Sequence, residues 1–114
     1  MPAVLTLRKT KDVTLNVSGR VFIIKRSKLA QYPDHFLGSA KLETFYDKER
    51  DEYFLERNSD VFTPFYEFYN SGYFKIPRGP PMAAILDEIE FLQVGYTLVP
   101  RNTAAHFLVA NKVF

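Results

Sequence analysis

With 114 residues, 46% of them hydrophobic, the chain has the size of one domain and can build a core without a metal or a disulfide. Its 15 Lys and Arg against 13 Asp and Glu leave a net charge of +2, far short of the concentrated basic surface that nucleic-acid binding needs. The absence of cysteine excludes disulfides, thiolate metal sites and cysteine nucleophiles, and no apolar run reaches the roughly 18 to 20 residues that span a bilayer.

A β-hairpin is predicted at the start of the patterned region. Val13, Leu15 and Val17 alternate with polar residues, and a second β-branched run covers residues 21–24. Gly19 between the two runs supplies the positive φ that a tight connection often needs. The polar side chains of the first strand are expected to face water or a neighbouring subunit.

A short helix and a further strand are predicted next. Ser27 is expected to cap a helix through Gln31, because Pro33 makes continuation beyond residue 32 costly. The charged stretch 45–57 is read as a loop that leads into a strand at residues 53–55.

The clearest helix follows the capping residues 58–60 and ends at Ser71-Gly72. Pro64 is tolerable there only in the first turn, where its missing N–H has no helical partner. Four aromatic residues at helical spacing are predicted to face the core, namely Phe62, Phe65, Phe68 and Tyr69. Residues 73–76 suggest a short strand, and a second amphipathic helix begins at Met82.

The residues that could carry chemistry do not form a motif. The chain has only two histidines, His35 and His106, which are far apart in the sequence and are read as surface or loop residues. The carboxylates of residues 47–56 alternate with Lys and Arg, as on a solvated face, and neither a Gly-x-Ser-x-Gly turn nor a glycine-rich phosphate loop occurs. We therefore expect no enzyme, no metal site and no cofactor.

Five ordered motifs resemble those of a known family. They resemble the cytoplasmic tetramerisation domain of voltage-gated potassium channels, Shaker type in particular, within the wider BTB/POZ group that includes soluble channel-tetramerisation-domain proteins. The motifs span most of residues 13–94 and are Val13-Thr-Leu-Asn-Val-Ser-Gly19, Leu29-Ala-Gln-Tyr-Pro-Asp34, Phe36-Leu-Gly38, Asp51-Glu-Tyr-Phe-Leu-Glu-Arg-Asn58 and Phe68-Tyr-Asn-Ser-Gly72.

The resemblance implies a BTB/POZ-like α/β (α+β) fold, a small sheet flanked by short helices, over residues 13–98. Residues 1–12 would form an N-terminal arm and residues 99–114 a C-terminal extension. By position, the family's largely polar side-by-side contacts implicate Arg20, Ile24, Lys25, Tyr53, Glu56, Arg57 and Asn58. Ile24 stands where Shaker-type domains commonly carry threonine, and no cysteine is present for the zinc site of non-Shaker domains.

The implied function is homo-oligomerisation in the cytoplasm, most simply subunit assembly of a potassium channel, with a tetramer favoured over a pentamer. In that setting the domain would lie at the cytoplasmic face of a membrane without inserting into it. The alternative is a soluble BTB-type adaptor that binds a cullin-type ubiquitin ligase or a signalling partner.

Overall fold

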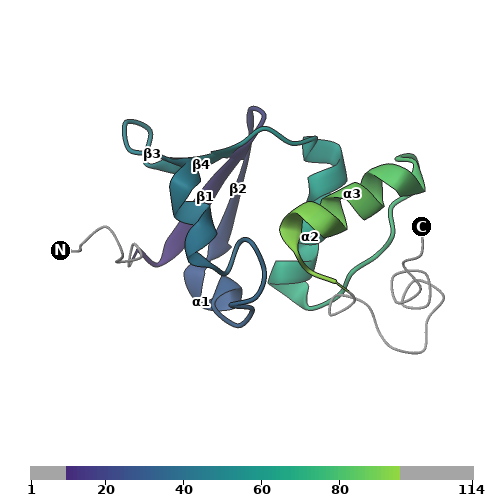
Figure 1. Ribbon diagram of the computed structural model, residues 1–114, viewed down its shortest axis with the longest axis horizontal. Helices are drawn as coiled ribbons and strands as arrows, with labels where there is room; N and C mark the ends of the chain where they lie inside the picture. Colours follow the sequence, from purple (N-terminus) through teal and green to yellow (C-terminus); the bar gives the residue numbers. More distant parts are fainter. Residues whose placement is uncertain (1–9, 96–114) are drawn as a thin grey trace.

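The computed structural model describes residues 10–95, in which helices cover one face of a four-stranded mixed sheet (Figure 1). The elements in chain order are β1 (Asp12–Val17), β2 (Arg20–Lys25), α1 (Arg26–Leu29), the 3-10 helix η2 (Ala40–Phe45), β3 (Tyr46–Asp47), β4 (Glu52–Leu55), α2 (Ser59–Ser71) and α3 (Met82–Leu92). The predicted α+β class, a small sheet flanked by short helices around one core, is confirmed. No helix in the described range is long and apolar enough to cross a membrane.

The predicted hairpin is present as β1 and β2. The strands pair antiparallel with Val17 opposite Arg20, so the connection is the two residues Ser18 and Gly19. Their φ angles of 50° and 104° are both positive, which suits the right-handed twist of the strands. The Gly19 N–H donates to Oδ1 of Asn16 at 2.7 Å and ties the turn to the strand.

The strand order β2-β1-β4-β3 places β1 inside the sheet, with β4 parallel to it and β3 antiparallel to β4. Leu15 and Val17 of β1 are consequently 0% exposed. The predicted strand at residues 53–55 is confirmed within β4, whereas η2 and β3 were not predicted.

Helix α2 fills the space beneath the sheet with aromatic rings. Asn58 caps its first turn, and Gly72, at φ 87°, ends it in the left-handed conformation. The four aromatic residues predicted for the core are all buried there. Pro64 is the sixth helical residue rather than a first-turn residue, and the carbonyl that loses its partner belongs to the exposed Asp60.

Two further expectations are corrected. Ser27 lies inside α1, whose N-cap is Lys25, since Arg26 N–H already bonds to the carbonyl of Lys11. Residues 73–76 form no strand, because they pair with no other strand in the described part of the chain. The predicted boundaries at residues 12 and 98 stay predictions, and residues 1–9 and 96–114 lie outside the described residues.

His35 lies in the turn after α1, in agreement with the loop interpretation, but its side chain is buried and only 3% exposed. Its Nδ1 lies 2.7 Å from the Tyr69 hydroxyl, and its ring stacks on Tyr32 with 4.6 Å between centroids. Burial lowers the pKa of His35, while the charge of Asp34 opposes that shift. The other histidine, His106, lies outside the described residues.

Candidate subunit interface

Two of the seven predicted contact residues belong to the core of the subunit. Ile24 pairs with Val13 on the face of the sheet that the helices cover and is 0% exposed. Tyr53 is 2% exposed, and its hydroxyl donates to Oε2 of Glu43 at 2.8 Å. Both side chains are buried within the subunit, and the seven-residue contact set stays a prediction.

Arg20 and Lys25 are exposed at opposite ends of β2, one of the two edge strands of the described sheet. Arg20 Nη1 lies 3.4 Å from Oδ1 of Asp60, with the two side chains 51% and 84% exposed. An ion pair of this kind contributes about 0 to 1 kcal/mol in water, so a neighbouring subunit can exchange it at little cost.

The other three predicted contact residues, Glu56, Arg57 and Asn58, line one hollow together with residues of α2 and α3. We name this the acidic hollow and define it by Glu56, Arg57, Asn58, Val61, Ala84, Asp87 and Glu88. Sequence reasoning missed Asp87 and Glu88. The only signal was the acidic run in the second amphipathic helix, 30 or so positions away from Arg57.

Arg57 is held inside this hollow by its own subunit. Its Nε and Nη2 donate to Oε1 of Glu88 at 3.1 and 2.8 Å, and its guanidinium lies 4.2 Å from the ring centroid of Phe91. Burial raises the pKa of Glu88, and Arg57 opposes that shift by favouring the carboxylate. The charge that Arg57 neutralises here, that of Glu88, belongs to its own subunit.

Asn58 and Glu56 differ in whether their side-chain oxygens are available to a neighbouring molecule. The Oδ1 atom of Asn58 accepts from the backbone N–H groups of Asp60 and Val61 at 2.9 and 3.2 Å, so it is committed to capping α2. Glu56 is exposed at the rim of the hollow. The hollow thus offers the carboxylates of Glu56 and Asp87 to a cationic neighbour.

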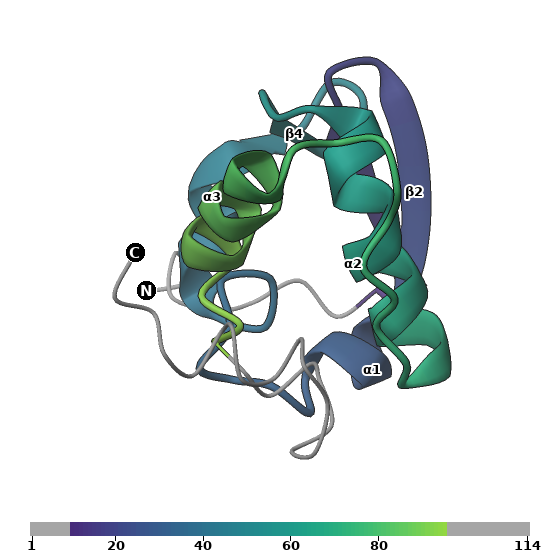
Figure 2. The same ribbon diagram turned by 90° about the vertical axis from the view of Figure 1, so that its right-hand side faces the viewer.

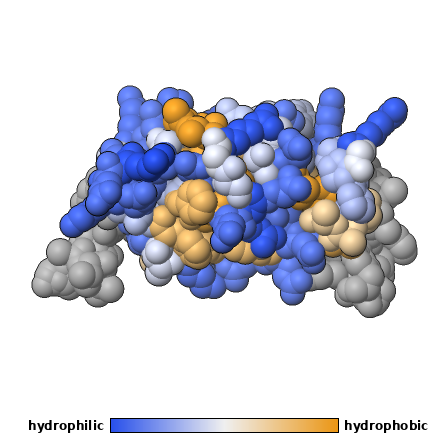
Figure 3. Space-filling model, turned by 90° about the horizontal axis from the view of Figure 1, so that it is seen from above, coloured by the Kyte–Doolittle hydropathy of each residue, from blue (hydrophilic) through white to orange (hydrophobic). Residues whose placement is uncertain are grey.

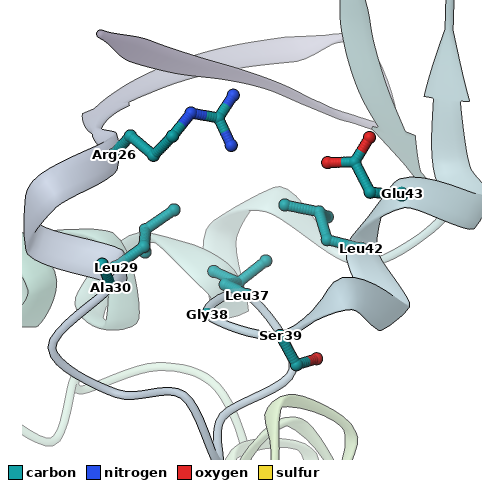
Figure 4. Close-up of a pocket in the computed structure, with 8 residues that line it drawn as sticks. All are labelled: Arg26, Leu29, Ala30, Leu37, Gly38, Ser39, Leu42 and Glu43. Atoms are coloured by element: carbon teal, nitrogen blue, oxygen red, sulfur yellow. The ribbon is translucent and has the colours of Figure 1, made fainter. Parts of the chain in front are cut away.

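A second pocket lies between α1 and η2 (Figure 4). Leu29, Leu37 and Leu42 point into its middle, and Arg26 and Glu43 lie across one side. The Arg26 guanidinium donates to the carbonyl and hydroxyl oxygens of Thr10 at 2.7 and 2.9 Å, and Glu43 accepts from Tyr53. The polar groups beside this pocket therefore make contacts within the chain.

Hydrophobic surface also reaches the outside of the molecule in separate patches among hydrophilic residues (Figure 3). Within residues 10–95, no group of three His, Cys, Asp or Glu side chains is placed to hold a metal ion, and the chain has no cysteine for a zinc-thiolate site.

Comparison with known protein families matches residues 13–101 to the BTB/POZ domain. The A-type voltage-gated potassium channel KCND3 of Oryctolagus cuniculus, and that of Homo sapiens, are 39% identical over 90 residues, which are 79% of this chain and 14% of each channel. The potassium voltage-gated channel protein Shal of Drosophila melanogaster is 37% identical over 89 residues, 76% of this chain and 16% of that protein. The chain thus spans less than a fifth of the length of these relatives.

Proposed function

Because the chain belongs to the BTB/POZ domain family, we propose that it is a homo-oligomerisation domain that assembles subunits side by side, most simply those of a potassium channel. The relatives named above are voltage-gated potassium channels, and each is matched over a short part of its length. In such a protein the domain works on the cytoplasmic side and contributes no catalysis.

The observation that carries the proposal is the placement of unlike charged surfaces on one subunit. Arg20 and Lys25 are exposed on β2, and Glu56 and Asp87 are exposed at the acidic hollow. A head-to-tail contact requires two different and complementary patches, and such contacts close into a ring when the rotation between copies fits. Like chains satisfy the charges of one another, whereas unlike chains leave them unpaired.

Native mass measurement of the full chain, over a range of concentrations and at low ionic strength, tests this function. We expect a species of four times the chain mass. A strictly monomeric chain at high concentration would contradict it.

The soluble adaptor is the second candidate, and the same measurement separates it. A pentamer, or a dimer that retains a purified cullin, would favour the adaptor over the channel-like assembly.

A further inference from the structure

The face of the sheet that points away from the helices carries large apolar side chains. Val21 and Ile23 of β2 are 53% and 54% exposed, and Phe54 of β4 is 44% exposed. Asn16 of β1 is the register partner of both Val21 and Phe54, so these side chains stand in one row across three strands. We call Val21, Ile23 and Phe54 the outer apolar face.

This face is not a by-product of building the core. The alternate residues of the same strands already supply the core side, with Phe22 5% exposed and Leu55 1% exposed. A sheet of this kind with one solvated side normally alternates apolar with polar residues, whereas β2 reads Val-Phe-Ile-Ile across both of its sides. Large exposed apolar residues gathered on one face of a sheet are typical of a contact surface.

The polar residue at the centre of the face is already satisfied. Asn16 Nδ2 donates to Oε2 of Glu52 at 2.7 Å, and its Oδ1 accepts the N–H of Gly19. Covering the face therefore removes apolar surface from water and does not strand the Asn16 amide without a partner.

We propose that the outer apolar face is the centre of the contact with a second copy of the chain. The exposed charged residues of β2 and of the acidic hollow form the rim of this contact. The inference rests on the proposed function and specifies the chemistry of its interface. Charge complementarity identifies a second copy as the occupant, because the edge strand β2 has two basic and no acidic residues, whereas α3 exposes two carboxylates, Asp87 and Glu90, and has no basic residue.

The positions of the two elements suit a head-to-tail contact. β2 and α3 lie on opposite sides of α2 (Figure 2). α3 also exposes apolar surface beside its carboxylates, since Met82 is 39% exposed and Ala83 is exposed too. One copy thus presents an apolar face with Lys25 at one end, and Arg20 on the other side of the same strand, where the next presents an apolar helix with acidic neighbours.

Substitution on the face tests the inference in the full chain. Ile23→Glu and Val21→Glu are each expected to raise the dissociation constant of the oligomer at least about 100-fold, because each places a charge in a desolvated centre. Ile23→Thr keeps the β-branched shape that suits a strand and is expected to weaken assembly in the same direction with the monomer folded. Tyr73→Glu is the matched control, since Tyr73 is 74% exposed and lies outside the sheet.

The readouts are native mass for assembly and circular dichroism with urea unfolding for the fold. An apolar centre also predicts that the wild-type oligomer survives about 1 M salt, where charge interactions are screened within about 3 Å. Wild-type assembly in all three face variants, or dissociation of the wild-type oligomer by salt, would overturn the apolar centre and leave the proposed function standing. A monomeric wild-type chain would overturn both.

Discussion

Two nitrogen atoms of Arg57 donate to a single oxygen of Glu88, Oε1, across 31 positions of sequence. Glu88 is only 2% exposed, and its other oxygen, Oε2, is buried with no hydrogen-bond partner within residues 10–95. The carboxylate therefore depends on Arg57 for its compensation. This pair joins the loop after β4 to α3 and so fixes the acidic hollow.

Replacing Arg57 by methionine is expected to destabilise the fold by about 3 kcal/mol, because it leaves the buried Glu88 charge uncompensated. Urea unfolding of the monomeric protein measures this loss. Substitution of Arg57 therefore affects folding as well as assembly. A charge reversal at Arg57 should also destabilise the folded monomer.

The matched control is the double variant Arg57→Met with Glu88→Met. It removes both charges from the site and should recover most of the lost stability, because an apolar pair often replaces a buried ion pair without cost. Glu56→Ala, at an exposed neighbour, should change stability by less than about 0.5 kcal/mol. Equal stability of Arg57→Met and Glu56→Ala would show that the pair contributes nothing.

The buried His35 predicts a loss of stability in weak acid. Because burial lowers its folded-state pKa below the ordinary value of 6.5, the unfolded chain binds the proton more readily. The stability that neutral His35 provides is fully present above pH 6.5 and is lost as the pH falls through the folded-state pKa.

Urea unfolding at pH 7.5 and pH 5.5 measures this effect, with His35→Gln as the comparison. The variant keeps a polar group near the Tyr69 hydroxyl but has no proton to gain, so its stability should fall less between the two pH values. An identical fall in both proteins would assign the pH dependence to other groups.

Local sequence patterns were enough to predict the elements that have a regular spacing of apolar residues. The hairpin followed from period-two alternation and Gly19, and α2 followed from four aromatic residues between Asn58 and Gly72. By contrast, β3 has only two residues and exists because Tyr46 meets Tyr53 across the sheet. Such a short strand carries no periodicity of its own.

The residues of the acidic hollow were harder to predict, because segments far apart in the sequence meet there. Family position identified Glu56 and Arg57 but not Glu88, because the Arg57–Glu88 contact depends on how α3 packs. Position also selected Ile24, although strand alternation places Ile23 outside and Ile24 inside. Once the register is known, exposure separates the two.

Gly38 is predicted to tolerate no larger residue. A Cβ atom there would lie 2.1 Å from the carbonyl oxygen of Tyr32 and 2.5 Å from that of Leu29, and neither backbone atom can move freely. We expect Gly38→Ala to cost about 3 kcal/mol in urea unfolding. Gly19→Ala is the comparison, because Gly19 has open space around it and its cost of about 1 kcal/mol comes from its positive φ alone. Equal costs would show that the turn at Gly38 rearranges.

Charge exchange between two variants tests the head-to-tail contact. Lys25→Glu places an acid on β2, and Asp87→Lys places a base at the acidic hollow, so each variant alone brings like charges together at every contact. We expect each to raise the dissociation constant roughly tenfold or more. Both sites are exposed, so the folded monomer should be little affected.

An equimolar mixture of the two variants should assemble again. In a ring where they alternate, the reversed charges meet at one contact and the original charges meet at the next. Alternation closes only in rings with an even number of subunits, so native mass should show a mixed tetramer with two copies of each variant and no mixed pentamer. Recovery to a pentamer would contradict strict alternation, and no recovery at all would show that Lys25 and Asp87 do not face each other across the contact.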